Sequence, residues 1–219
     1  MGFFNFAKAI EQSLYDVMMW VFFYPYTLFR MILFPSSTMG FVREETDRDP
    51  NSAFSSAMQP AIFLFISIAI GAIMAPLTSS ELTVVEGSDV GRLVAGSWFA
   101  LLLYRTVIFA FFALVGAALS DMLTPGRLSR ETMRAPFHQQ CYICAPFALI
   151  VSPTMVDFAS GIDAAGMIPL AAVTLWFILC QYLFFRRFAG QSIVLSALLA
   201  PAVLIIGAIG AAMFAVPFL

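Results

Sequence analysis

Long apolar runs constrain this chain more than any other feature of its sequence. Five of them approach the roughly 20 residues that an α-helix needs to cross the hydrocarbon core of a bilayer. Hydrophobic residues make up 61% of the 219 residues and charged residues 11%, with a mean hydropathy of +0.92, which excludes an ordinary soluble domain. The sequence therefore predicts an all-α integral membrane protein with a bundle of five transmembrane helices in residues 61–219. The predicted spans are residues 61–77, 93–119, 141–158, 165–185 and 192–218.

Basic residues fall on alternate segments between these runs and predict the orientation. By the positive-inside rule, the segments that carry them lie in the cytoplasm, so we expect a cytoplasmic N-terminus and a periplasmic C-terminus. The loop at 78–91 carries three acidic residues and no basic one. Arginine outnumbers lysine ten to one, which suggests a GC-rich bacterial genome. The membrane expected for this chain is the bacterial inner membrane. The basic residues concerned are Lys8, Arg30, Arg43, Arg48, Arg127, Arg130, Arg134, Arg186 and Arg187.

Residues 1–60 are predicted to form a cytoplasmic N-terminal segment. Within it, residues 17–34 are apolar but hold Pro25, Arg30 and a cluster of Trp and Tyr, which favour the membrane interface. We expect an interfacial amphipathic helix, or a hairpin kinked at Pro25. A sixth span is the alternative, although it would move Lys8 across the membrane. Residues 41–59 are predicted to be a polar linker.

The stretch HQQCYICAP holds the only histidine, His138, together with Cys141 and Cys144. On a continuous helix the outer two of these side chains lie about 9 Å apart along the axis, too far for one ion to bind all three. We expect the polar approach to a membrane span, with cysteines acting as small hydrophobic residues. A thiol pair or metal site is the alternative, and no cofactor is expected.

Arg105 lies near the centre of the second run, where a charge costs roughly 2.5–3.5 kcal/mol on insertion scales. Such a side chain should avoid lipid. As a structural anchor it would donate to helix carbonyls or to hydroxyls such as those of Ser152, Thr154 or Thr174. As a functional residue it would line a cavity and bind an anion.

No catalytic motif is present, because the P-loop, nucleophile-elbow and HExxH patterns are all absent. We therefore expect no enzyme and no nucleic-acid binding. Small residues spaced four apart predict close helix packing and, more weakly, self-association. These pairs are Gly71 with Ala75, Gly116 with Ser120, Gly207 with Ala211, and Ala208 with Ala212.

The sequence is compatible with two functions. One is a scaffold or accessory subunit that binds lipids, other integral membrane proteins or itself. The other is a transporter of a small or lipidic substrate, with Arg105 in its cavity. The transporter function is supported by the proline-rich stretch at 145–154, where a broken helix would free carbonyls to line a cavity.

The order of segments resembles the Yip1 superfamily as it occurs in bacteria, where its members are often labelled permease-like. The resemblance rests on ILFP before a polar linker, on NSAFSSAMQPAIFLF, and on GRLSRETMRAPFHQQCYICAPFAL at the start of the third span. Tyr142 and Pro146 stand where that family has its Tyr-x-x-x-Pro-like pattern. The resemblance extends from about Phe3 to Phe214. It implies a five-span protein that organises membrane components and has no catalytic site. The DLYGP-type and GYG motifs of eukaryotic members are absent, so a role in vesicle trafficking does not carry over.

Overall fold

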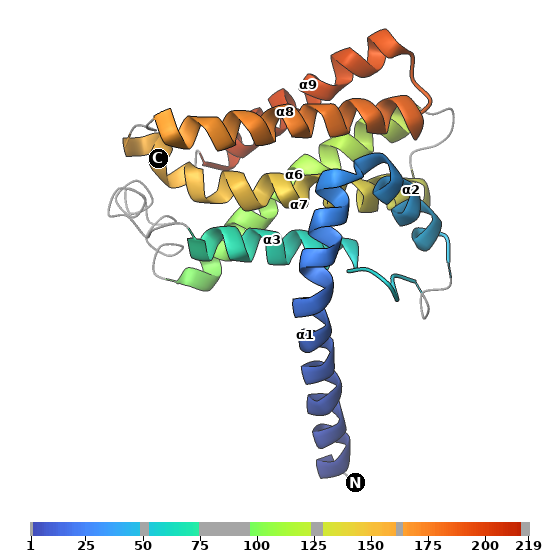
Figure 1. Cartoon of the computed structure of the whole chain (residues 1–219), viewed down its shortest axis with the longest axis vertical. Coiled ribbons are helices and arrows are strands. Elements are labelled where there is room, and N and C mark those ends of the chain that lie inside the picture. Colours follow the sequence, from blue (N-terminus) through green and yellow to red (C-terminus); the bar gives the residue numbers. More distant parts are fainter. Residues whose placement is uncertain (1, 49–52, 75–96, 124–128, 161–163, 216–219) are drawn as a thin grey trace.

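The computed structural model describes residues 2–48, 53–74, 97–123, 129–160 and 164–215, with side chains described over 18–48, 53–74, 97–123, 129–153 and 167–214. Across these ranges the regular structure is entirely helical (Figure 1). The helices are α1 (Gly2–Leu33), α2 (Pro35–Thr46), α3 (Pro60–Met74), α6 (Trp98–Met122), α7 (Arg130–Ser160), α8 (Ala164–Arg187) and α9 (Ile193–Ala215).

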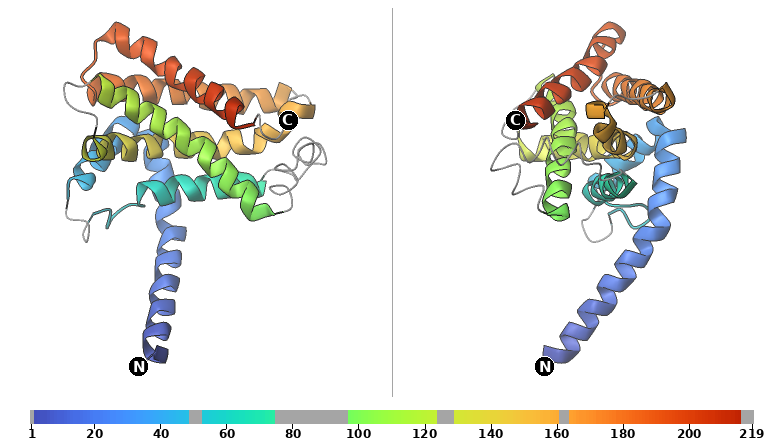
Figure 2. Two further views of the ribbon diagram at one scale, coloured as in Figure 1. Left: turned by 180° about the vertical axis from the view of Figure 1, so that it is seen from behind. Right: turned by 90° about the vertical axis from the view of Figure 1, so that its left-hand side faces the viewer.

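Helices α3, α6, α7, α8 and α9 form a bundle, and α1 crosses it at a steep angle and extends well beyond it (Figures 1 and 2). The central helix is α7, which packs against α2, α3, α6 and α8. Its residues 139–148 are all buried. The core around them is rich in phenylalanine, and the Phe147 ring lies 4.4 Å from that of Phe177 on α8, centroid to centroid.

Among the residues that the structure describes, three helical segments are long and apolar enough to cross a membrane: Trp98–Met122, Met167–Arg187 and Ile193–Phe214. Two shorter apolar helical segments, Met18–Leu33 and Pro60–Met74, accompany them. Many outward-facing side chains on the long helices are apolar and well exposed, for example Leu114, Leu175 and Ile205. An apolar exterior of this kind matches acyl chains rather than water. The chain is therefore a membrane protein whose regular structure is helical throughout the described residues.

The hairpin predicted at Pro25 is wrong, because α1 continues through this residue as one helix to Leu33. Pro25 is exposed, so its ring and its missing N–H lie away from the bundle. The chain turns instead at Phe34, where Pro35 begins α2. The Thr38 hydroxyl lies 3.0 Å from the Arg30 carbonyl oxygen and 2.9 Å from that of Phe34, which gives these end groups a donor.

The predicted linker at 41–59 is partly helical, since α2 extends to Thr46. Although α2 is polar in composition, it has one buried face, which packs against α7. This face contains Thr38, Met39, Val42, Glu45 and Thr46.

Helix α7 begins at Arg130, eleven residues before the predicted third span, and continues without a break to Ser160. The prolines at 136, 146 and 153 lie inside it, so the broken helix expected at 145–154 is wrong. Most of the described side chains in this part of α7 are buried against neighbouring helices, and such packing allows a helix to tolerate proline in a membrane.

Glycines mark the closest helix contacts. A Cβ atom added to Gly71 on α3 would lie 3.0 Å from the Leu149 carbonyl oxygen on α7. One added to Gly207 on α9 would lie 2.3 Å from the Phe112 ring on α6. Gly71, Gly116 and Gly207 lie at helix interfaces as predicted, whereas Ala208 and Ala212 are exposed. Ala75, the predicted companion of Gly71, lies outside the described residues.

Candidate functional site

Arg105 is buried on α6, with 7% of its surface exposed, and its Nη1 donates to the Ser152 hydroxyl of α7 at 3.3 Å. Ser152 is thus one predicted partner that the fold places beside the guanidinium. Thr174 instead donates to the Leu170 carbonyl oxygen within α8 at 2.8 Å, and the Thr154 side chain lies outside the described residues. The Arg105 contact joins α6 to α7 inside the bundle.

The three cysteines, Cys141, Cys144 and Cys180, are free and fully buried. His138 points to a different neighbourhood, where its ring packs edge-on against Phe54 at 5.9 Å between centroids. Among the described side chains, no group of three His, Cys, Asp or Glu residues is placed to hold a metal ion. Cys141 and Cys144 of HQQCYICAP therefore lie in the core of the bundle, whereas His138 lies outside it, beside Phe54.

Burial makes these thiols unreactive in the folded chain. A membrane-permeant maleimide should leave all three cysteines unlabelled in mild detergent and label them fully after denaturation in SDS, because reagent and thiol cannot meet in a packed core. Mass spectrometry of the intact chain counts the adducts. Rapid labelling of Cys141 in the folded protein would contradict this packing.

His138 connects α7 to the buried face of α2. The Thr46 hydroxyl donates to the Val42 carbonyl oxygen at 2.7 Å and lies 2.9 Å from His138 Nδ1. Because the single hydroxyl proton is used by Val42, Nδ1 of the neutral ring carries the proton and donates to Thr46. One residue along, Gln139 donates to the Met39 carbonyl oxygen at 2.8 Å. Adjacent side chains of α7 thereby hold two turns of α2.

Burial and the nearby Arg134 guanidinium lower the pKa of His138 below its usual value. The folded chain therefore binds the proton less readily than the unfolded chain, and acid favours unfolding. The contribution of the neutral ring to stability is complete above about pH 6.5 and is lost as the pH falls through the lower pKa of the folded state. Thermal unfolding in detergent should show this loss, and His138→Phe should flatten it. An unchanged slope in the variant would assign the acid effect to other groups.

A buried pair of amides was missed by the sequence analysis. Gln140 Nε2 donates to Gln181 Oε1 at 2.9 Å and Gln181 Nε2 donates to Gln140 Oε1 at 2.7 Å, and both side chains are fully buried. Gly116 on α6 leaves room for the pair, since a Cβ atom there would lie 2.4 Å from the Gln140 amide carbon. Gln181 within the apolar run FILCQYLFF was the available signal. Each amide nitrogen thus donates to the carbonyl oxygen of the other residue, and the two hydrogen bonds join α7 to α8.

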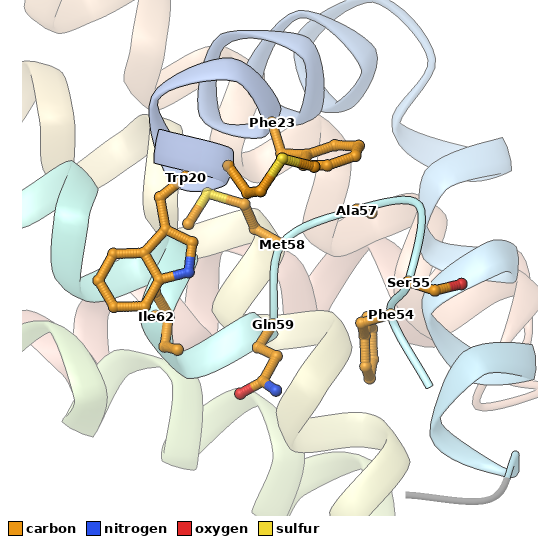
Figure 3. Close-up of a pocket in the computed structure, with 9 residues that line it drawn as sticks. Trp20, Phe23, Phe54, Ser55, Ala57, Met58, Gln59 and Ile62 are labelled. Carbon is orange, nitrogen blue, oxygen red and sulfur yellow. The ribbon is translucent and has the colours of Figure 1, made fainter. Parts of the chain in front are cut away.

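An open groove of about 330 Å³ lies between α1 and the segment leading into α3 (Figure 3). Its lining is mostly apolar or aromatic, and it includes Met19, Trp20, Phe23, Phe54, Met58 and Ile62. A second open cavity of about 300 Å³ lies among Asp47, Arg48, Glu131 and Arg134, where the charges balance. Arg105 lines neither.

Over the described residues, the fold and these contacts define a helical membrane protein in which Arg105, Gln140 and Gln181 pair across helices. Comparisons of the chain with protein-family models, with curated proteins and with solved structures found no match.

Proposed function

We propose that this chain is a non-enzymatic scaffold or accessory subunit that binds or organises other membrane proteins or lipids. In the proposed arrangement, α3 and α6 to α9 form five membrane spans in a bacterial inner membrane. The N-terminus is cytoplasmic and the C-terminus periplasmic. The earlier resemblance to the Yip1 superfamily implies the same arrangement and remains part of this proposal.

The observation that carries the proposal is the placement of α1. Its C-terminal half is fixed to the bundle, where the Tyr24 hydroxyl lies 3.1 Å from that of Ser67 on α3. Trp176 on α8 donates to the Ile32 carbonyl oxygen at 3.3 Å. The preceding part of the helix extends beyond the bundle (Figures 1 and 2), and Met18, Val21 and Phe22 are more than 70% exposed. An anchored helix with a free apolar face suits an attachment surface.

The depth of the bundle contacts supports an interfacial position for α1. Thr27 on α1 and Tyr142 on α7 both hydrogen-bond to the backbone of Met58. Tyr142 lies eighteen residues before Ser160 at the end of α7, a rise of about 27 Å, close to the hydrocarbon thickness of about 30 Å. A helix that crosses the bundle steeply at this level lies near the plane of one membrane surface.

This arrangement predicts a specific topology. Single cysteines placed in a cysteine-free variant should react with an impermeant reagent from the cytoplasmic side near Arg130 and Arg187, and from the periplasmic side at Glu86. The reason is the alternation of basic segments, which are retained in the cytoplasm. Labelling of intact and broken cells compares the two sides. Cytoplasmic labelling at Glu86 would overturn the five-span arrangement.

The interior contacts support a scaffold over a transporter. A transporter needs polar groups that are released to a substrate, whereas the Gln140 and Gln181 amides satisfy each other and Arg105 donates to Ser152. The transporter with Arg105 in its cavity is the alternative function.

Photo-crosslinking in native membranes tests the scaffold. A photoreactive residue at Phe22, 71% exposed on α1, should give protein adducts of discrete mass. The matched control is Leu175, 69% exposed on α8, which should give lipid adducts only. Equal adduct patterns at the two positions would contradict a role for α1 in partner binding.

A further inference from the structure

Buried side chains from three helices hold the backbone of the segment that forms one wall of the groove beside α1. The Glu45 carboxylate of α2 accepts the Phe54 N–H at 2.7 Å. The Thr27 hydroxyl of α1 lies 3.5 Å from the Met58 nitrogen, and the Tyr142 hydroxyl of α7 donates to the Met58 carbonyl oxygen at 2.5 Å. Glu45, Thr27 and Tyr142 are almost completely buried. The segment that lines the groove is therefore held in place from three directions.

Phe54 adds backbone strain to this wall. Its φ of 59° lies in the left-handed region, which is unusual for an aromatic residue and strains the backbone. The Glu45 contact holds its N–H, and its ring lies against that of His138 and borders the groove. A strained residue that its surroundings hold in place is a common sign of a binding site.

The lining combines apolar surface with two hydrogen-bond donors. Figure 3 shows the indole nitrogen of Trp20 turned toward the groove, with the Gln59 amide at its edge. Within the described part of the chain, nothing accepts from the Trp20 N–H or from the Gln59 side chain, and no charged residue lines the groove. The lining therefore suits a ligand with an apolar part and uncharged acceptor oxygens.

The groove opens onto surfaces that face the bilayer. Ile62 in its lining continues along α3 into the exposed Phe65, and Trp20 adjoins the exposed Val21 and Phe22 on α1. The groove also lies at the level of Tyr142, where the proposed membrane arrangement places the boundary between headgroups and hydrocarbon. At that boundary, lipid ester groups and the first part of the acyl chains are present at high concentration.

We propose that this groove binds one acyl chain of a membrane glycerophospholipid, with a glycerol ester oxygen accepting hydrogen bonds from Trp20 and Gln59. Its volume of about 330 Å³ is at the lower end of the range for ligand pockets, roughly 300–1,000 Å³, and suits a single chain. One turn of a partner helix, about 5.4 Å long and 10–12 Å across with its side chains, needs roughly 400 Å³ or more and so exceeds this volume. The inference deepens the proposed function, on whose membrane arrangement it rests, by naming a lipid as the ligand.

Tryptophan fluorescence tests this site with a brominated phosphatidylcholine as the quencher. The full chain, stripped of lipid in mild detergent, is titrated alongside Trp20→Phe, and the difference between them isolates Trp20. A Trp20→Phe/Phe22→Trp variant places a matched reporter on the exposed face of the same helix. Trp20 quenching should saturate near one lipid per chain, whereas the matched reporter should respond gradually to the lipid fraction of the micelle.

Loss of the second donor provides an independent test. Gln59→Ala should raise the lipid concentration for half-maximal Trp20 quenching about fivefold, the effect of one hydrogen bond. Identical gradual curves for Trp20 and the matched reporter would overturn the lipid site. An unquenched Trp20 in a chain that sediments as a dimer would also overturn it and assign the groove to a second copy. Neither result affects crosslinking from Phe22, so failure of the lipid site is distinguishable from failure of the scaffold.

Discussion

Gly71→Ala is expected to lower the stability of the folded chain by about 1–3 kcal/mol, and Gly71→Leu to prevent α3 from packing on α7. The added Cβ atom would lie 2.9 Å from Ser152 Cβ, 3.0 Å from the Leu149 carbonyl oxygen and 3.3 Å from the Ala148 carbonyl oxygen. Two of these atoms belong to the backbone of α7, so no side-chain rotation relieves the contact. The helices must separate, and the interface between them loses its packing.

Thermal unfolding in detergent and the yield of monodisperse protein measure the effect. Gly40→Ala on α2 is the matched control, because its Cβ atom would meet only Phe188 Cζ at 4.0 Å. Alanine also favours a helix over glycine by about 1 kcal/mol, so the control should be neutral or slightly stabilising. If Gly71→Ala melts at the same temperature as the parent, the close approach of α3 and α7 is wrong.

The two C-terminal helices follow directly from hydropathy. The predicted spans at 165–185 and 192–218 coincide closely with α8 and α9, since uninterrupted apolar runs leave a chain few alternatives to membrane helices. The start of α6 is less well predicted, because Ser97 caps the helix where the run 93–119 had already begun. A capping serine inside an apolar run has little effect on hydropathy.

Polar residues that are buried by tertiary contacts explain the errors. Gln139 and Gln140 interrupt the apolar pattern, so the eleven residues of α7 before Cys141 were not predicted as part of this helix, although α2 and α8 cover both glutamines. Glu45 contributed to the prediction of a polar linker at 41–59, although it is buried on α2. Neither burial follows from local pattern, because each depends on a partner far away in the chain. Gln140 and Gln181 are 41 residues apart, and only the pairing of α7 with α8 brings them together.

The candidate sites were predictable to different degrees. Arg105 was identified from its cost in a membrane, and the fold supplies the Ser152 hydroxyl as an acceptor. The groove beside Trp20 was not identified, since it depends on a left-handed Phe54 and on a segment held by three separate helices. Aromatic residues in a sequence indicate an interface, but the hollow between them is a property of the packed chain.

Arg105→Leu is expected to give a poorly folded chain, and Arg105→Lys to recover part of the yield. Leucine removes the charge together with every donor, which leaves the Ser152 hydroxyl and other acceptors bare at about 1–3 kcal/mol each. Lysine keeps a charge and three donors on a flexible stem but lacks the planar fork of arginine. Thermal melts of both variants in detergent, beside the parent chain, measure the difference.

Ser152 connects this prediction to the one for Gly71, because the same residue accepts from Arg105 and contacts the Cβ position of Gly71. Ser152→Ala keeps the Cβ atom and removes only the acceptor, so it should cost less than Arg105→Leu and change little when combined with it. Effects that add fully in the double variant would mean that the arginine is anchored elsewhere. If Arg105→Leu is as stable as the parent, the guanidinium is not a structural anchor. A buried charge that stability does not require would then favour the transporter with an anionic substrate at Arg105.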